Sequence, residues 1–330
     1  MKIVQFLASK GWGGLENIFV SLCNELSKNI DLSVIVLEGS LVKCKLNTGI
    51  KVYVLKRNAS RMNPLLYMEL NKILQDINPS LVHTHGAKAS EIFYRLNKTL
   101  NLVGIASKHN VRKGKVFNKF SNVIAVSKAV KESIENSNSK IIYNGIPYRK
   151  PKKISLANSF NIIAVGSLRK IKGYDKLIKA VSQLTFEYHL TIIGVGEEKS
   201  FLETLIKKLS LSSRVSLVGF KSNVNDYLNT CQLQVISSES EGFSLAMAEG
   251  IFYAPILLST RVGVCVEILP EELLCDIQDL TRKITDIYKN QEEYIGHFND
   301  IKQNYKEKLT IKICAIEHNS FYQGLLKEKK

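Results

Sequence analysis

Two carboxylates, Glu241 and Glu249, stand eight positions apart around a turn and the start of a helix. The apolar run Leu233 to Ile236 predicts a buried strand, Gly242 interrupts it, and the residues from Leu245 favour helix. Glu241 is then expected at the carboxyl end of the strand and Glu249 inside the helix. This arrangement suits binding of the hydroxyl groups of a nucleotide sugar. The alternative is an ordinary strand-turn-helix unit in which both glutamates are solvated.

The same turn offers backbone donors to an anion. A helix that starts near Leu245 leaves the N–H groups of Gly242, Phe243, Ser244 and Leu245 without partners inside the helix. These groups and the positive end of the helix dipole favour a phosphate. A phosphate site is therefore predicted close to the two carboxylates.

Each half of the chain has a glycine-rich turn after its first expected strand. The first places Gly13 and Gly14 directly before a helix, where the backbone can approach a ligand closely. The second, Gly166 to Gly173, carries three cations suited to a pyrophosphate, namely Arg169, Lys170 and Lys172. Simple turns beside solvated lysines are the alternative. Neither turn has the GxGxxG spacing, which disfavours a nicotinamide enzyme.

Strand and helix patterns alternate in both halves of the chain. Strands are expected at residues 2–7, 32–37, 52–55, 81–85, 102–106, 123–126 and 141–143, then at 161–165, 190–193, 215–218 and 233–236. Helices are expected between them, including residues 15–26, 64–77, 174–184, 198–209 and 224–229. This pattern predicts an α/β fold with two doubly wound, Rossmann-like domains facing a central cleft. A basic, proline-containing stretch places the boundary between residues 150 and 151.

Length and composition also favour two domains. The chain has 330 residues, of which 45% are hydrophobic, and this exceeds what one compact core usually needs. It has no apolar run of about 18 residues and no secretory signal pattern, so a cytoplasmic protein is expected. Its six cysteines lack paired CxxC spacing, which favours buried thiols over disulfides or zinc ligands.

Positive charge is concentrated in the first half. Residues 1–150 have a net charge of +14, whereas residues 151–330 have +2, out of +16 in total. Such a field favours a polyanion or an anionic membrane surface over a small neutral ligand. A lysine-rich solvated surface is the alternative. Nucleic acid is not expected as a partner, because the chain lacks interleaved aromatic platforms and any known reader motif.

Over essentially its whole length, the chain resembles the GT-B glycosyltransferases, and specifically the retaining family 4 group with its bacterial surface-glycan enzymes. The E-x7-E motif of that family matches Glu241 to Glu249. Its G-x-L-x-x-x-K-G donor loop matches Gly166 to Gly173, and its G-G-x-E motif matches Gly13 to Glu16. Weaker matches are His83-Thr-His85, Asn144-Gly145 and the segment from Arg261 to Glu267.

The resemblance implies roles for the donor-side residues. Glu249 would bind the ribose of the donor and Glu241 the transferred sugar, while Lys172 and the backbone of residues 242–245 would contact phosphate and sugar hydroxyls. The family often has arginine after the first glycine of the donor loop, where this chain has Ser167, and Arg169 could replace it. His85 corresponds to the histidine near the reacting sugar, although a structural histidine at a strand end is the alternative.

The resemblance also implies transfer with retention of configuration and without a metal. Preorganised cations and helix N–H groups would stabilise the departing diphosphate. The chain has no DxD motif, which is the usual metal handle of the other glycosyltransferase fold. No cofactor is expected beyond the donor itself, for which we expect a UDP-sugar. Neither the sugar nor the linkage can be chosen from the sequence.

The acceptor is expected to bind the basic first domain. The segment after a predicted strand carries four candidate acceptor ligands, His109, Arg112, Lys113 and Lys115. Phosphorylated lipopolysaccharide core or a lipid-linked saccharide would fit them, with the basic face in peripheral contact with the inner face of the plasma membrane. An ordinary solvated loop is the alternative.

The resulting domain assignment has three parts: an acceptor domain (1–150), a donor domain (151–309) and a C-terminal helix (310–330) that crosses back to the first domain. Two other functions remain open. A GT-B sugar-nucleotide epimerase would share the phosphate loops but use no acceptor, and a non-catalytic sugar-nucleotide-binding protein would lack turnover.

Overall fold

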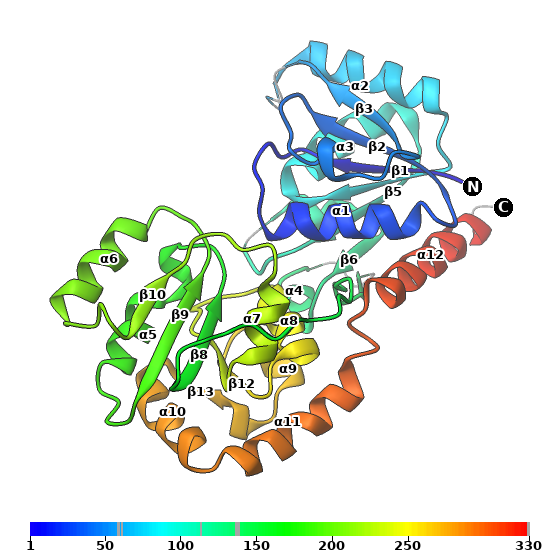
Figure 1. Cartoon of the computed structure of the whole chain (residues 1–330). Helices are drawn as coiled ribbons and strands as arrows, with labels where there is room; N and C mark the ends of the chain where they lie inside the picture. The colour runs from blue at the N-terminus through cyan, green and yellow to red at the C-terminus, as the bar shows by residue number, and fades with distance from the viewer. Residues whose placement is uncertain (58–59, 61, 113, 136–138, 329–330) are drawn as a thin grey trace. The chain divides into compact units, whose positions relative to one another are not determined.

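The computed structural model describes residues 1–57, 60, 62–112, 114–135 and 139–328. It divides the chain into two compact units, Met1–Pro147 with Leu309–Lys330 (unit 1) and Tyr148–Lys308 (unit 2) (Figure 1). The chain first passes from unit 1 to unit 2 after Pro147, three residues before the boundary expected after Lys150. Within the described residues, no helix has both the length and the apolar character needed to cross a bilayer.

The described part of unit 1 contains a sheet of seven parallel strands in the order β3-β2-β1-β4-β5-β6-β7. These strands are β1 (Lys2–Leu7), β2 (Asp31–Leu37), β3 (Lys51–Leu55), β4 (Leu81–His85), β5 (Val103–Lys108), β6 (Val123–Ala125) and β7 (Ser139–Ile141). Between and after them lie α1 (Gly14–Leu26), η1 (Lys43–Lys45), α2 (Pro64–Ile77), α3 (Gly86–Leu100), η2 (Phe117–Lys119), α4 (Lys128–Glu132) and α12 (Ile311–Glu328). The strand order reverses between β1 and β4, as in a doubly wound sheet.

Helix α2 shows how local sequence sets these elements. The Asn63 side chain accepts a hydrogen bond from the Leu65 N–H, and Pro64 occupies the first helical position, where no N–H is needed. The buried positions Leu66, Leu70, Leu74 and Ile77 recur at helical spacing and face the core. The cap and this periodicity place the helix at the residues expected from the sequence.

The C-terminal helix α12 belongs to unit 1 and lies beside α1 (Figure 1). The returning chain is held by a pair of backbone hydrogen bonds, Ile146 N to Leu309 O and Ile311 N to Ile146 O. Gly145 is required at this crossing, because a Cβ atom there would collide with the Thr310 carbonyl. Tyr322 of α12 is fully buried in the same core as Phe19 of α1.

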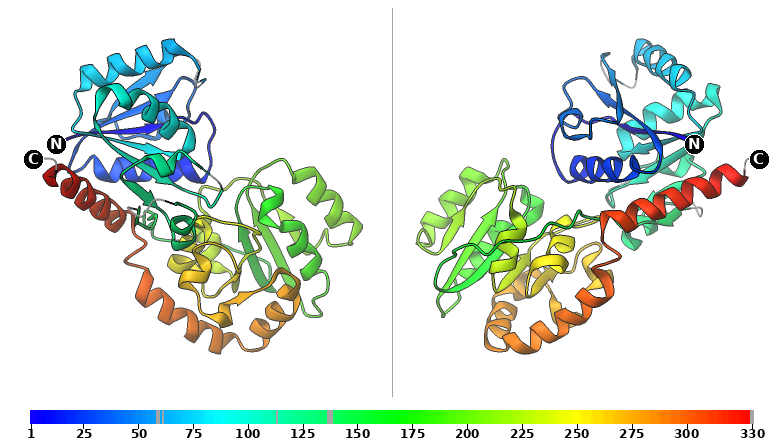
Figure 2. Two further views of the ribbon diagram at one scale, coloured as in Figure 1. Left: turned by 180° about the vertical axis from the view of Figure 1, so that it is seen from behind. Right: turned by 45° about the vertical axis from the view of Figure 1, so that its right-hand side comes forward.

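Unit 2 repeats the topology with six described strands in the order β10-β9-β8-β11-β12-β13, all parallel. They are β8 (Phe160–Val165), β9 (Tyr188–Ile193), β10 (Val215–Leu217), β11 (Leu233–Ile236), β12 (Leu257–Thr260) and β13 (Leu274–Cys275). The α-helices are α5 (Tyr174–Val181), α6 (Lys199–Lys208), α7 (Val224–Thr230), α8 (Leu245–Tyr253), α9 (Cys265–Ile268), α10 (Leu280–Lys289) and α11 (Gln291–Tyr305). Short 3-10 turns are η3 (Lys170–Lys172), η4 (Glu271–Leu273) and η5 (Ile277–Asp279). Figure 2 shows the strands of each unit with helices on both faces of the sheet.

Element positions follow the sequence pattern closely, and the differences at β7 and α5 have structural causes. β7 lies two residues before the strand expected at 141–143, and the chain then leaves the sheet toward the crossing at Ile146. Helix α5 ends at Val181 instead of Leu184, because the N–H groups of Gln183 and Leu184 bond carbonyls three positions back, those of Ala180 and Val181, and so tighten the last turn. Leu184 lies after the helix but is buried like the apolar residues of the helix. The apolar pattern of the sequence therefore predicted a helix that was three residues too long.

Tyr322→Phe tests the anchoring of α12. The Tyr322 hydroxyl accepts from Gln5 Nε2 at 2.9 Å and lies 2.7 Å from His83 Nδ1, all within the buried core. Removing it leaves two buried polar groups without this partner, so we expect the free energy of unfolding of unit 1 to fall by about 1–3 kcal/mol. Urea unfolding and limited proteolysis near Leu309 measure the effect. Tyr288→Phe, at a 37% exposed tyrosine, serves as control; equal stability of the two variants would contradict a structural role for the Tyr322 hydroxyl.

Candidate active site

The strand order of unit 2 reverses between β8 and β11, which are hydrogen-bonded neighbours. At such a reversal the loops leaving the two strands diverge to opposite faces of the sheet and leave an opening at the carboxyl edge, where doubly wound proteins bind ligands. The loop after β8 is the segment Gly166–Gly173, and the loop after β11 carries Glu241 and leads into α8. The topology therefore brings the two donor-side motifs together.

Close backbone contact joins these two loops. Gly173 has a φ of +63°, and a Cβ atom there would collide with the Ser237 carbonyl oxygen. Ser237 Oγ donates to the Lys172 carbonyl at 2.9 Å, and Glu239 N donates to the Ile171 carbonyl at 2.8 Å. The donor loop is thereby fixed against the segment that follows β11.

Two glycines in the loop after β9, Gly194 and Gly196, pack against the donor loop. Cβ atoms at Gly194 and Gly196 would collide with the carbonyl oxygens of Gly166 and Leu168, respectively. The backbone also pairs across the two loops, from Leu168 N to the Val195 carbonyl at 2.9 Å. Close packing on the donor loop thus explains these two glycines, which the sequence pattern left without a role.

Lys172 and Glu241 form an ion pair at this edge. Lys172 Nζ lies 2.5 Å from Glu241 Oε1, and the side chains are 21% and 11% exposed. Ser238 Oγ donates to the same carboxylate oxygen at 2.8 Å. Burial raises the pKa of the Cys265 thiol to about 12; the Glu241 charge adds to this rise, whereas a hydrogen bond with Ser259 and the Lys172 charge oppose it. Cys265 is therefore a buried thiol without nucleophilic character.

The start of α8 lies beside this ion pair. Ser244 caps the helix by accepting from the Met247 N–H, and the preceding Gly242 and Phe243 are buried. Leu245, the first helical residue, is partly exposed. The backbone N–H groups of residues 242–245 thus lie at a helix N-terminus, where a phosphate is favoured.

Glu249 lies on the second turn of α8 in a different environment from Glu241. Its side chain is partly buried, and burial raises the pKa of the Glu249 carboxyl to about 7, although the positive charge of Arg149 opposes this rise. Arg149 N also donates to the Tyr253 hydroxyl at 2.8 Å. A carboxyl that titrates near neutrality is typical of binding and catalytic sites.

Arg169 is exposed at the start of η3, and the neighbouring Ser167 is also exposed. Within the described residues Arg169 makes no ion pair, whereas Lys172 is paired with Glu241. The structure thus leaves Arg169 available to an anion at this edge. Arg261, in the segment similar to the family pattern, instead binds Glu271 at 2.6 Å.

Unit 1 has its own strand reversal, between β1 and β4, where Leu7 pairs with His85. The loop after β1 ends at Gly13, which precedes α1, and Gly14 is the first helical residue. Glu16 is buried and accepts a hydrogen bond from Ser9 Oγ at 2.5 Å, which closes the loop on itself. Both glycines therefore lie at the carboxyl edge of this sheet.

His85 lies deep in this edge. It is 2% exposed, and its ring nitrogens contact Gln5 Oε1 at 2.7 Å and His109 Nε2 at 3.4 Å. Burial, followed by the charges of neighbouring histidines, lowers the pKa of His85 well below its usual value. Both ring nitrogens of His85 thus have protein partners, and its contact with the reacting sugar stays a prediction.

His109, directly after β5, has a ring nitrogen without a hydrogen-bond partner among the described residues. Gln5 donates to Tyr322 through Nε2, so its oxygen accepts from His85 Nε2–H. Neutral His85 then accepts at Nδ1 from His109 Nε2–H. Burial, with a smaller effect of His318, lowers the pKa of His109 to about 3, so His109 is also neutral. Its Nδ1 is left as a buried acceptor with no partner among the described residues.

The remaining acceptor candidates lie on the loop after β5. Arg112 and Lys115 are exposed, and Lys113 lies outside the described residues. Lys108, at the start of the same basic run, is 1% exposed and donates to the Ser133 carbonyl and hydroxyl at 2.8 Å, so its role is structural. The charges available to a ligand thus come from the distal part of the loop.

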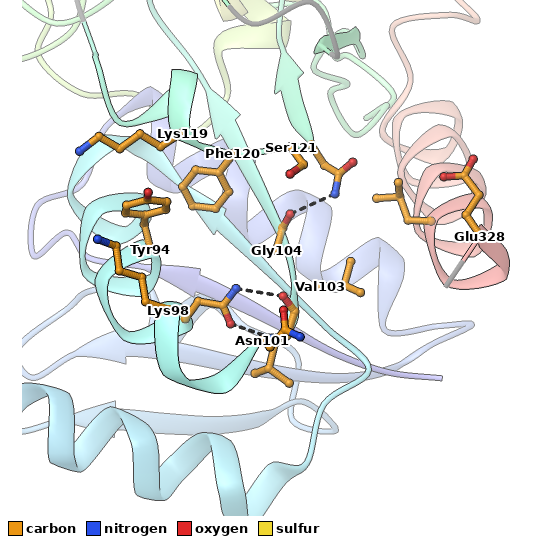
Figure 3. A pocket seen from close by; sticks show the side chains of 13 residues that line it. Tyr94, Lys98, Asn101, Val103, Gly104, Lys119, Phe120, Ser121 and Glu328 are labelled. Carbon is orange, nitrogen blue, oxygen red and sulfur yellow. Dashed lines mark hydrogen bonds between the residues drawn. The ribbon is translucent and has the colours of Figure 1, made fainter. Parts of the chain in front are cut away.

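A surface hollow in unit 1 lies away from these residues. It is lined by Tyr94, Lys98, Lys119 and the start of β5 at Val103 and Gly104 (Figure 3). The start of β5 is the amino edge of the parallel sheet, opposite the edge that carries His85 and His109. None of the residues expected from the sequence to form the site lines this hollow.

Ser238, Gly263 and Arg149 join the donor side although no motif singled them out as ligands. Ser238 holds Glu241. Gly263, with a φ of +44°, lies so close to the Glu241 carbonyl that a Cβ atom would collide with it. Arg149 acts on Glu249 from the first residues of unit 2. Of these three residues, only Gly263 lies in a segment that the sequence analysis matched to the family pattern. Its contact partner Glu241 is 22 positions earlier in the sequence, so the pattern did not predict the contact.

Two family models match consecutive parts of the chain. The model described as Glycosyltransferase Family 4 matches residues 12–150, and the one described as Glycosyl transferases group 1 matches residues 149–308. The matched residues carry the glycine turn and histidines of unit 1 and the donor loop and glutamates of unit 2.

Known proteins similar to the chain include surface-glycan enzymes. The O-antigen biosynthesis glycosyltransferase WclY of Escherichia coli is 23% identical over 99% of both chains. The lipopolysaccharide core biosynthesis glycosyltransferase LpsD of Rhizobium meliloti is 25% identical over 72% of both. The crystal structure of Anabaena HepE in complex with UDP-glucose superposes with a TM-score of 0.86 at 18% identity, covering 98% of this chain and 100% of HepE. The chain is a glycosyltransferase of the GT-B fold and belongs to the family 4 (group 1) glycosyltransferases.

Proposed function

We propose that this glycosyltransferase moves a hexose or N-acetylhexosamine from a UDP-sugar to a cell-surface glycan, with retention of configuration and without a metal. The observation that carries the proposal is the grouping of Lys172, Glu241, the α8 N-terminus and Glu249 at one strand reversal. The UDP-glucose complex of HepE supports the donor class, and the names of WclY and LpsD support the acceptor class.

In this proposal the donor loop and α8 stabilise the leaving group. Breakage of the glycosidic bond places negative charge on the departing diphosphate and positive charge on the sugar. The N–H groups of residues 242–245 are held in place by the start of α8, so they favour that charge without reorganising, and Lys172 and Arg169 add positive charge beside them. Glu241 orients the sugar through its hydroxyl groups, and Glu249 accepts hydrogen bonds from the ribose.

Unit 1 supplies the acceptor side and a histidine. His109 Nδ1 accepts a hydrogen bond from a substrate hydroxyl, since it is a neutral acceptor without a protein partner. His85 is then a positioning residue that fixes the His109 tautomer. Arg112 and Lys115 bind anionic groups of the glycan or glycolipid acceptor.

Unit 1 also has the surface properties of a membrane-contacting body. Its net charge is +14, against +2 for unit 2. Met62, Leu65 and Met68, at the start of α2, are 81%, 49% and 67% exposed, and the exposed cations Lys56 and Arg57 precede them. Exposed apolar side chains beside cations favour the surface of an anionic bilayer.

The donor assignment is tested by thermal shift with UDP-, GDP- and ADP-sugars. A ligand that binds only the native state raises the melting temperature, so UDP-sugars should give the largest shift. With the best donor, Lys172→Met should lower turnover by about 10²–10³-fold, because the leaving diphosphate loses its cation. Turnover is measured as UDP release coupled to sugar transfer onto a lipopolysaccharide or lipid-linked acceptor fraction.

Lys176→Met is the matched control for this variant. Lys176 is also ion-paired, to Glu239, but its side chain is 40% exposed and has no place in the proposed phosphate site. It should keep turnover within about twofold, since exposed ion pairs contribute little. Equal losses in both variants would contradict the role of Lys172, and donor turnover without any sugar transfer would favour an epimerase.

Donor binding should depend on the protonation of Glu249. With a pKa of about 7, the carboxyl is mostly protonated below that pH, and a protonated carboxyl accepts poorly from ribose hydroxyls. The affinity for UDP-glucose should therefore rise with pH, by up to about tenfold per unit below pH 7, and level off above it. Calorimetry between about pH 5.5 and 8.5 measures this profile. Glu249→Gln should bind weakly with a flat profile, and a sloping profile in that variant would exclude Glu249 as the source.

Membrane contact is tested with vesicles of phosphatidylcholine alone or with phosphatidylglycerol. Binding should require the anionic lipid and should fall steeply from about 0.1 to 0.5 M NaCl, because salt screens the attraction. Changing Met62, Leu65 and Met68 together to Ser should weaken binding, whereas Phe201→Ser, at a 52% exposed residue of unit 2, should not. Equal binding to neutral vesicles, or no change with salt, would refute an electrostatic contact.

A further inference from the structure

The Lys172–Glu241 ion pair joins two residues to which the proposed function gives different ligands. Lys172 is assigned to the diphosphate and Glu241 to the transferred sugar, yet their charged atoms lie 2.5 Å apart. Ser238 Oγ also binds the Glu241 oxygen that contacts Lys172. Within the described residues Lys172 has no second carboxylate partner. A diphosphate that binds Lys172 would therefore meet the Glu241 carboxylate at the same ammonium group.

The backbone around the pair has little freedom to relieve this competition. Gly173 lies against the Ser237 carbonyl, and Gly263 lies against the Glu241 carbonyl. Thr260 Oγ1 donates to the Ser238 carbonyl at 2.6 Å, which fixes the turn between them. The two side chains can move, but the loops that carry them are packed against each other. An exchange of partners would therefore take place between side chains, without movement of the loops.

The cost of that exchange differs between the intact donor and the free nucleotide. When a diphosphate takes Lys172, the Glu241 carboxylate loses its cation and faces a second anion at short range. With an intact donor, the sugar hydroxyls replace the lost ammonium as hydrogen-bond donors to Glu241. With UDP alone no such group is present, and the carboxylate is left largely desolvated and repelled.

We infer that Glu241 is an internal competitor of the nucleotide diphosphate for Lys172, and that it lowers the affinity for free UDP relative to the intact donor. This inference rests on the proposed function. Once the sugar has been transferred, Glu241 recovers Lys172 and favours release of UDP. Lys172 is in turn a positioning residue, because it holds the sugar-binding carboxylate in place until a donor arrives.

A double-mutant cycle with UDP measures the competition directly. Glu241→Gln keeps the size of the side chain but removes its charge, so the Kd for UDP should fall by about 5- to 10-fold, in the range of typical coupling energies. Lys172→Met should weaken UDP binding. In the Lys172→Met background, Glu241→Gln should change the Kd by less than about twofold, because the contested cation is gone. Calorimetry gives the Kd values, and stopped-flow measurement should show slower UDP release from Glu241→Gln.

Glu239→Gln is the matched charge control. Glu239 lies two positions before Glu241 and is also paired with a lysine, Lys176, but both side chains are about 40% exposed, at 42% and 40%. This variant removes one negative charge from the same loop without releasing Lys172. Its Kd for UDP should stay within about twofold of that of the unchanged protein.

The outcomes separate this inference from the proposed function. No binding of UDP to the unchanged protein would overturn both. UDP binding that is not tightened in Glu241→Gln would overturn the inference alone. Equal tightening in Glu239→Gln, or in the Lys172→Met background, would overturn it as well, since a general charge effect would then be sufficient. Melting curves establish that each variant is folded, and Glu241→Ala, with the same expectation, replaces Glu241→Gln if that variant does not fold.

Discussion

The contact between Gly173 and Ser237 is the constraint on which the donor side depends. It exists because the strand order reverses between β8 and β11, so that two loops leave the same edge of the sheet side by side. Only a residue without Cβ, in a left-handed conformation, allows the donor loop to approach the Ser237 carbonyl. Lys172 and Glu241 then face each other across this contact. Displacement of either loop would separate the cation from the carboxylate and from the α8 N-terminus.

The two glutamates of the E-x7-E motif differ in their surroundings, and this difference fits two roles. Glu241 is neutralised by Lys172 and held by Ser238 at the strand end. Glu249 lies on α8 without an ion pair among the described residues, where burial outweighs the charge of Arg149 and raises its pKa to about 7. A carboxylate that changes partners suits a site occupied and vacated in each turnover. A carboxyl whose pKa lies near 7 would make ribose binding depend on pH around neutrality.

In unit 1 the C-terminal helix takes part in the site through hydrogen bonds. Tyr322 of α12 binds Gln5, Gln5 binds His85, and His85 binds His109. Because all these rings and the amide are buried or partly buried, each hydrogen bond fixes the donor or acceptor state of the next group. Helix α12 thereby helps, through Tyr322, to determine which nitrogen of His109 is an acceptor.

The sequence by itself determined the alternation of strands and helices, the two glycine turns and the E-x7-E segment, because these depend on short-range periodicity, turn chemistry and helix capping. It also indicated the crossing near Lys150, since composition changes there. Tertiary structure alone decided which histidine keeps a nitrogen without a hydrogen-bond partner, which lysines form ion pairs and which residue faces Glu241. Those properties arise from residues such as Gln5 and Tyr322, or Lys172 and Glu241, that are 317 and 69 positions apart. No local pattern records such contacts, because the sheet order creates them only when the chain is folded.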